Sequence, residues 1–176
     1  QNIEREKKIE VLAEYDGLRN QTVAVLVQTD MATLYQFPSV VADIAVNLSR
    51  RIQMNVEGAQ VLNPAAVLDW TYHQPGWEMM PYGEVCEELG VDRVVWIDVF
   101  EFRLNPPGNR WQWEGVAGAS IGIVEADGFD ADAFSENYDI SSEFPKIAEL
   151  GRESSTEEKI KTGLLATFVQ QAGWLF

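Results

Sequence analysis

The chain has 176 residues, and its 13 Lys and Arg against 28 Asp and Glu give a formal net charge of −15. This balance argues against nucleic acid as the main partner and against adsorption to an anionic membrane, because both require clustered cations. The hydrophobic fraction of 46% indicates one domain with a substantial core, while one cysteine and one histidine exclude an intrachain disulfide and a multi-histidine metal site.

Residues 1–19 are predicted to form an N-terminal helical segment ahead of a single mixed α/β domain over residues 20–176. Residues 2–15 combine a weak apolar stripe with charges that alternate in sign, which is typical of a solvated helix. The chain begins with Gln1 rather than Met, so we expect that residues have been removed ahead of it, with a signal peptide or a lipid anchor as candidates. No apolar run reaches the roughly 18–20 residues of a transmembrane helix.

A βαβ unit is predicted at the start of the domain. Residues 22–27 form a continuous apolar run rich in β-branched side chains, which is typical of a strand buried on both faces. Pro38 suits the first turn of an amphipathic helix, which we expect over residues 38–54 because apolar residues recur there at 3–4 spacing. With a short strand over residues 59–62, these elements predict a right-handed crossover.

Three more helices are expected along the chain. Residues 63–72 and 81–89 each begin at or beside a proline, which suits the start of a helix. Near the C-terminus, Ser155 and Glu158 match a capping box, and the apolar stripe that follows predicts a helix that ends near residue 172.

A long β-hairpin is predicted between these helices. Strands over residues 93–103 and 110–125 flank a short loop rich in Pro, Gly and Asn, and a register centred on Pro107 would place Val95 opposite Ala119. Residues 126–143 are expected to form an acidic loop insertion with one short strand inside it. The predicted fold class is therefore α/β (α+β), a single-domain mixed sheet with a long hairpin and flanking helices in a three-layer or two-layer sandwich.

Two tryptophans near the hairpin loop are the candidate partner-binding residues. Trp111 and Trp113 are two residues apart, so a strand would place them on one face, next to Arg110. Such a pair can anchor a protein partner or stack on a sugar ring, and it can equally cap the core. The sequence leaves these alternatives open.

The net charge is concentrated after the hairpin loop. Residues 111–145 contain eight acidic residues and no Lys or Arg. Within them, Asp127, Asp130, Asp132 and Glu136 supply the oxygen ligands that calcium requires, although the EF-hand spacing is absent. The alternatives are a calcium site and a solvated acidic loop.

Most of the other residue patterns have structural rather than catalytic interpretations. Gly118-Ala-Ser-Ile-Gly122 matches the G-x-S-x-G nucleophile elbow, but it lies in a predicted strand, so we interpret it as small residues beneath a helix. Cys86 is interpreted as a buried helix residue, and His73 as a residue at a helix end. Asp98 is either a functional carboxylate or part of a half-polar sheet face.

The order of elements resembles one bacterial family. Residues 88–99 read Glu-Leu-Gly-Val-Asp-Arg-Val-Val-Trp-Ile-Asp-Val, in which a helix ends at a glycine and a strand follows directly. This resembles the envelope-lipoprotein domain shared by the curli-secretion lipoprotein, the penicillin-binding-protein activator lipoprotein and the N-terminal domain of the Tol–Pal propeller protein, over about residues 20–176. The resemblance implies an α/β sandwich, a periplasmic or outer-membrane-attached location, an N-terminal lipid anchor and a protein-binding role, without catalytic residues.

The leading hypothesis is a non-enzymatic protein-interaction module of the cell envelope, without a cofactor and with a partner that is basic where it meets the acidic stretch. One alternative is a small-ligand or glycan-binding protein, or a hydrolase, that uses Trp111, Trp113 and carboxylates such as Asp98. Another is a calcium-binding module built on the acidic residues 125–136.

Overall fold

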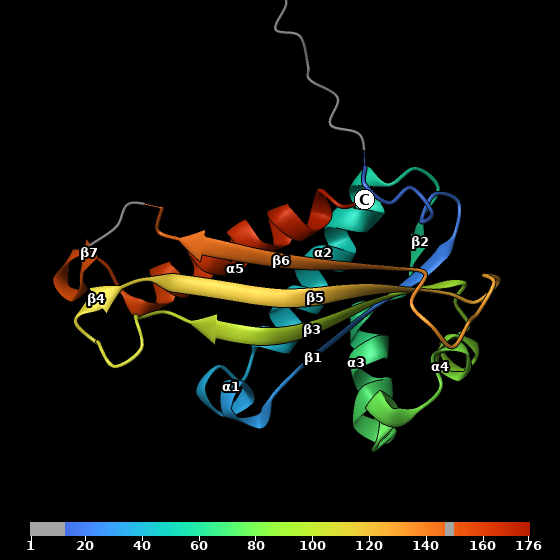
Figure 1. Cartoon of the computed structure of the whole chain (residues 1–176), viewed down its shortest axis with the longest axis horizontal. Coiled ribbons are helices and arrows are strands. Elements are labelled where there is room, and N and C mark those ends of the chain that lie inside the picture. Colours follow the sequence, from blue (N-terminus) through green and yellow to red (C-terminus); the bar gives the residue numbers. More distant parts are fainter. Residues whose placement is uncertain (1–12, 147–149) are drawn as a thin grey trace, which may run out of the picture.

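The computed structural model describes residues 13–146 and 150–176, and in this part of the chain a five-stranded mixed sheet forms the middle layer (Figure 1). The strand order is β2–β1–β3–β5–β6, in which β1 runs parallel to β2 and β3, and β5 runs antiparallel to β3 and β6. The strands are β1 (Thr22–Thr29), β2 (Gln60–Val61), β3 (Arg93–Arg103), β5 (Gly115–Glu125) and β6 (Glu136–Phe144). The predicted mixed α/β fold class is confirmed.

Helices cover both faces of the sheet, which makes three layers (Figure 1). α2 (Val40–Asn55) and α5 (Glu157–Gly173) pack side by side on one face, while α3 (Pro64–His73) and α4 (Tyr82–Leu89) cover part of the other. Apolar spacing explains the larger core, because one stripe of each long helix faces the sheet. The stripes consist of Ile44, Leu48 and Ile52 in α2 and Ile160, Leu164 and Phe168 in α5.

The first crossover contains a helix that the sequence pattern missed. α1 (Met31–Gln36) follows β1 directly, and the Asp30 side chain caps it by accepting a hydrogen bond of 2.7 Å from the Thr33 amide. None of its residues is buried, so it carries no apolar stripe that a periodicity argument could detect. Two 3₁₀ turns, Trp77–Met79 and Arg152–Ser154, were also not predicted.

The predicted hairpin register is wrong by four residues. Val95 lies opposite Ile123 rather than Ala119, and the register shifts again at a bulge between Val99 and Glu101. The cause is that the predicted second strand is broken: β4 (Gln112–Trp113) leaves the main sheet and pairs with β7 (Leu150–Gly151). The connection between β3 and β5 is therefore longer than the loop alone.

Half of the predicted acidic loop is a regular strand. β6 has nine residues and pairs with β5 from Glu136–Ile123 to Phe144–Gly115. Its core-facing residues include Ile140 and the buried Ser142, so one face carries too few apolar side chains for a clear alternation. Only residues 126–135 connect the two strands.

The described part of the N-terminal segment is not the helix that the sequence predicts. Residues 1–12 of the predicted helix lie outside the described residues, and residues 13–15 are not helical. Tyr15 and Leu18 are buried in the larger core, so this segment packs with the domain that follows. At the other end, the helix cap is Thr156, whose hydroxyl accepts from the Lys159 amide at 3.3 Å, rather than Ser155. No helix in the described part of the chain is long and apolar enough to cross a membrane.

Candidate functional site

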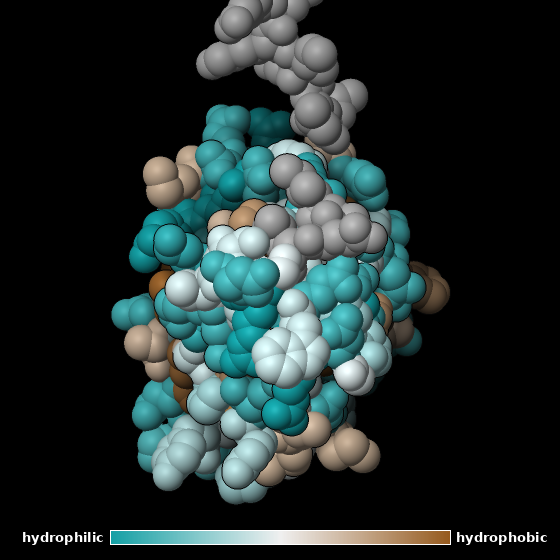
Figure 2. Space-filling model, turned by 90° about the vertical axis from the view of Figure 1, so that its left-hand side faces the viewer, coloured by the Kyte–Doolittle hydropathy of each residue, from teal (hydrophilic) through white to brown (hydrophobic). Residues whose placement is uncertain are grey.

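The hairpin tip carries an exposed tryptophan beside two arginines. The Trp111 side chain is 77% exposed and lines a cavity of about 590 Å³ together with Arg110 and Arg152. Figure 2 looks onto this end of the molecule and shows mainly hydrophilic and intermediate surface, with separate hydrophobic groups rather than one large patch. An amphipathic ring that shares a cavity with two arginines is suited to a contact with an acidic or planar group.

Trp113 is buried beneath the tip and connects it to Arg152. It is only 5% exposed, and its Nε1 donates to the Arg152 carbonyl at 3.1 Å. The Arg152 amide in turn donates to the Trp111 carbonyl at 2.9 Å. The two tryptophans therefore do not share an exposed face, because Trp113 is buried and anchors Arg152 beside Trp111. The partner-binding role of Trp111 and Arg110 stays a prediction.

Asparagine side chains stiffen the loop that presents Trp111. The Trp111 amide donates to Asn109 Oδ1 at 3.0 Å, and Asn105 Nδ2 donates to the Gln112 carbonyl at 2.8 Å. Gly108 has a φ of +76°, a conformation that a side chain at this position would strain. A tip held by these bonds loses little conformational entropy on binding, which favours affinity.

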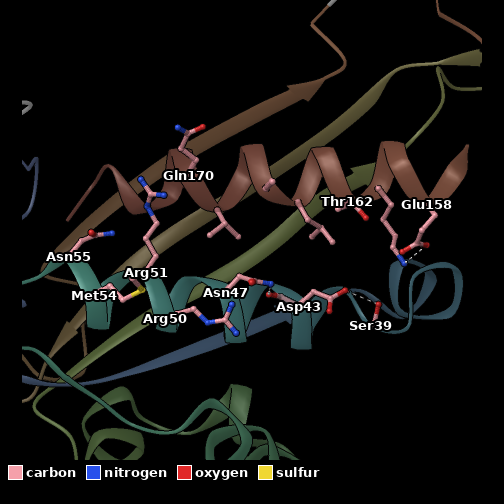
Figure 3. Close-up of a pocket in the computed structure, with 14 residues that line it drawn as sticks. Ser39, Asp43, Asn47, Arg50, Arg51, Met54, Asn55, Glu158, Thr162 and Gln170 are labelled. Atoms are coloured by element: carbon pink, nitrogen blue, oxygen red, sulfur yellow. Dashed lines mark hydrogen bonds and ion pairs between the residues drawn. The ribbon is translucent and has the colours of Figure 1, made fainter. Parts of the chain in front are cut away.

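A second cavity lies on the outer side of the helical layer, between α2 and α5 (Figure 3). It has a volume of about 680 Å³. Leu165, Val169 and Met54 supply apolar surface, and polar and charged side chains of both helices line the rest. We call this the α2/α5 groove.

The charges of the α2/α5 groove are separated along its length (Figure 3). Asp43 accepts from Ser39 Oγ at 2.9 Å, and Glu158 pairs with Lys161 at 3.5 Å, so the anions of that end have partners. Arg50 and Arg51 lie toward the other end and take part in none of the ion pairs among the described residues.

Arg51 crosses the α2/α5 groove because α5 has a glycine opposite it. The side chain points from α2 toward Gln170 on α5 (Figure 3), and a Cβ placed on Gly173 would overlap it. The guanidinium is thus held over the groove by the shape of the helix pair. The cation of Arg51 is available to a bound anion at a defined position.

The acidic candidates for calcium binding are engaged in separate interactions. Asp127 forms an ion pair with Arg93, Asp132 Oδ1 accepts from the Gly83 amide at 3.0 Å, and Asp130 Oδ1 accepts from the Asp132 amide at 2.9 Å. Glu136 belongs to β6. Among the described residues no group of three or more potential ligands is placed to hold a metal ion, so this geometry lends no support to a calcium site.

The acidic turn and the hairpin tip lie at opposite ends of β5 (Figure 1). An 11-residue strand separates them, which corresponds to about 36 Å. The residues 126–135 that connect β5 to β6 and the Trp111 tip therefore do not form one combined contact surface. The acidic turn between β5 and β6 (residues 126–135) and Trp111 can serve only as two separate contact regions.

Arg93 is the centre of a buried network at the acidic end. Its side chain is 8% exposed and pairs with Asp127 and, at 3.4 Å, with Glu125, whose Oε2 also accepts from Tyr15 Oη at 2.7 Å. Burial and the hydrogen bond to Glu125 raise the pKa of Tyr15, while the hydrogen bond from Arg93 lowers the pKa of Asp127. This network attaches the segment around Tyr15 to the sheet and is structural.

Asp98 and the G-x-S-x-G sequence lie on the partly uncovered face of the sheet. Asp98 and Ser120 line a cavity of about 130 Å³ with Trp96 and Phe134, whereas Trp111 lines a different cavity. Ser120 lies within β5 and donates to Asn137 at 3.0 Å. No strand-to-helix turn is present at Ser120, so the G-x-S-x-G sequence is not a nucleophile elbow. Because Asp98 and Trp111 line different cavities, the geometry lends no support to a glycan-binding protein or hydrolase that uses both residues.

The interpretations of Cys86 and His73 agree with the structure. Cys86 is 1% exposed in α4, and burial raises the pKa of its thiol to about 11. His73 is the last residue of α3, and its Nδ1 lies 2.9 Å from the Asp69 carbonyl oxygen. Neither residue takes part in a nucleophile–base pair.

We expect Cys86 to be nearly unreactive toward a thiol reagent in the folded protein. At pH 8 a thiol with a pKa near 11 is almost entirely protonated, and the surrounding core excludes the reagent. Labelling followed by mass spectrometry should give slow modification in buffer and complete modification in 6 M guanidinium. Fast labelling of the folded protein would contradict the burial of this residue.

Sequence reasoning missed Arg152, Arg50 and Arg51 as candidate binding residues. Arg152 reaches Trp111 only because β4 pairs with β7, a contact between segments about 40 residues apart that has no local signal. Arg50 and Arg51 do have a signal, since two cations lie side by side near the end of an amphipathic helix. What could not be predicted is that α5 lies beside them.

No protein-family model matches this sequence, and no curated protein matches it either. The fold is nevertheless shared with solved bacterial proteins. Lipoprotein GNA1162 from Neisseria meningitidis is 16% identical, with 86% of this chain and 96% of that chain covered at a TM-score of 0.50. The PelC dodecamer from Paraburkholderia phytofirmans is 12% identical, with 94% of this chain and 90% of that chain covered at a TM-score of 0.53. Hypothetical protein CT253 from Chlamydia trachomatis is 12% identical, with 86% of this chain and 95% of that chain covered at a TM-score of 0.51.

At these low identities, the structural matches show a common fold and nothing about a shared activity. The chain thus has the fold of a bacterial lipoprotein, as the resemblance at the sequence level implied. The particular likeness to the curli-secretion lipoprotein, the penicillin-binding-protein activator lipoprotein and the Tol–Pal propeller protein stays a prediction.

Proposed function

We propose that this chain is a non-enzymatic interaction module of the bacterial cell envelope, and that it binds a protein partner through the hairpin tip. The observation that carries the proposal is the exposure of Trp111, at 77%, in a cavity that Arg110 and Arg152 also line. Tryptophan and arginine are the residues most enriched among interface hot spots. The hydrogen-bonded loop and the buried Trp113 hold Trp111 and Arg152 in position before a partner binds.

The charge of the tip determines which partner surface it suits. Two arginines favour carboxylates on the partner, since a guanidinium pairs with a carboxylate in a bidentate manner. The basic partner surface expected from the sequence would apply only to the acidic turn at the other end of the sheet. A partner that binds the tip should therefore present acidic and apolar groups together.

The proposed location rests on the fold. A lipoprotein from Neisseria meningitidis has this fold over 96% of its length, which supports a cell-envelope location for this chain as well. Fractionation of host cells that express the complete gene product tests this part independently of any partner. Recovery with the envelope fraction is expected, and recovery with the cytosolic fraction would overturn it.

Replacement of Trp111 tests the role of the tip. We expect Trp111→Ala to reduce recovery of the partner from envelope extract at least tenfold, because a hot-spot side chain contributes about 2 kcal/mol or more to binding. Quantitative mass spectrometry of proteins captured by the tagged chain measures this. Trp113 is left intact, since its removal would release Arg152 and change the fold of the tip.

Trp174→Ala is the matched control, because Trp174 is also exposed, at 58%, and is close in sequence to the C-terminus, which lies far from the tip in Figure 1. Recovery with this variant should equal that of the parent protein. Equal recovery with Trp111→Ala and Trp174→Ala, both folded by circular dichroism, would rule out the tip as the contact surface.

A further inference from the structure

The turn between β5 and β6 displays a phenylalanine that the fold does not use. Phe129 is fully exposed, whereas Phe134 in the same turn lies on Gly122 and stacks on Tyr82 with ring centroids 4.5 Å apart. Burial of an exposed phenylalanine against another surface would contribute about 2–3 kcal/mol, so a contact at this position would be favourable.

The turn holds Phe129 outward in a defined conformation. The Gly128 amide donates to the Glu125 carbonyl at 3.1 Å, and the Ser135 amide donates to the Ile123 carbonyl at 2.8 Å. Asp130 and Asp132 follow Phe129, are exposed and take part in none of the ion pairs among the described residues. The turn therefore presents one aromatic ring followed by two carboxylates that accept backbone hydrogen bonds but have no cationic partner among the described residues.

The α2/α5 groove has the complementary composition. Met54, Leu165 and Val169 supply apolar surface, and Met54 is 77% exposed. Methionine adapts its shape readily to an incoming aromatic ring. Arg50 and Arg51 stand beside this surface without an ion-pair partner among the described residues, and the cavity of about 680 Å³ has room for a side chain and its neighbours.

We propose that the α2/α5 groove binds the β5–β6 turn of a second copy of this chain, with Phe129 on the apolar surface and Asp130 and Asp132 next to Arg50 and Arg51. Charge complementarity indicates this occupant: in a chain of net charge −15, two arginines of the groove and two carboxylates of the turn have no ion-pair partner among the described residues. The turn and the groove are different surfaces, so the contact is head-to-tail and generates a ring or an open chain of copies. It uses neither Trp111 nor Arg152 and is independent of the proposed function.

Sedimentation velocity at 0.15 M salt, over a range of protein concentrations, tests the proposal. At this salt, charge repulsion between copies is screened beyond about 8 Å. The parent protein should self-associate as concentration rises. Phe129→Ser and Arg50→Glu/Arg51→Glu should each weaken association by about 30-fold or more, as loss of a hot spot does.

Matched variants separate the contact from general changes in charge or hydrophobicity. Met79→Ser removes another exposed apolar side chain (88% exposed), and Lys146→Glu/Lys159→Glu makes the same change in charge outside the groove. Both should associate like the parent protein. Association that falls equally in these controls would overturn the proposal.

Mixing the two defective proteins gives the decisive result. Phe129→Ser keeps an intact groove and Arg50→Glu/Arg51→Glu keeps an intact turn, so a mixture should form a one-to-one heterodimer and stop there. A parent protein that is monomeric at all concentrations, or a mixture that stays monomeric, would refute the contact. Association of the parent that Phe129→Ser leaves unchanged would assign it to another surface.

Discussion

Replacement of Arg93 by methionine is expected to lower the free energy of unfolding by about 3 kcal/mol, because it breaks a buried ion-pair network. The guanidinium is 8% exposed and binds Asp127, Glu125 and the carbonyls of Gly17 and Asp92. Methionine fills a similar volume but leaves Glu125, 25% exposed, without its cation. Partial access of water to both carboxylates keeps the cost near the lower end of the usual 3–5 kcal/mol.

Urea unfolding followed by tryptophan fluorescence measures this change in stability. Arg19→Met is the control, since Arg19 pairs with Glu57 at 2.7 Å but both side chains are more than half exposed. Removal of such a surface pair should cost about 0–1 kcal/mol. A loss below about 1 kcal/mol for Arg93→Met would show that the network contributes little to folding.

Replacement of Phe168 by alanine is expected to cost about 3–5 kcal/mol, because it opens a cavity at the centre of the larger core. Phe168 is fully buried on the face of α5 that packs against the sheet. The neighbours come from several elements, so they cannot all move to fill the space that the ring leaves. The helix itself would tolerate alanine well, so the loss reports packing rather than helix propensity.

The same substitution at Phe129 provides a control of identical chemistry. Phe129 is fully exposed, so Phe129→Ala should change the stability by less than about 0.5 kcal/mol at concentrations where the protein is monomeric. Thermal unfolding of both variants measures the contrast. If Phe129→Ala proved as costly as Phe168→Ala, the turn would have to contact the core in a way the structure does not show.

The local sequence pattern correctly predicted those helices and strands whose determining residues lie within a few positions of one another. The β-branched run of residues 22–27 became β1, and β3 begins and ends where predicted, at Arg93 and Arg103. Prolines and caps located α3 and α4 to within about one residue. In each case the determining interactions are between close neighbours in the chain, so the sequence alone contains them.

The remaining features depend on contacts between distant segments. β6 has one weakly apolar face, and it is a strand because β5 offers a free edge for pairing. Trp111 and Trp113 are both strand-compatible tryptophans in the sequence, yet Trp113 belongs to the larger core and donates to the Arg152 carbonyl, whereas Trp111 stays exposed. The α2/α5 groove exists because two helices more than 100 residues apart pack side by side. Such long-range contacts have no local signature, so the α2/α5 groove and the position of Arg152 beside Trp111 became visible only in three dimensions.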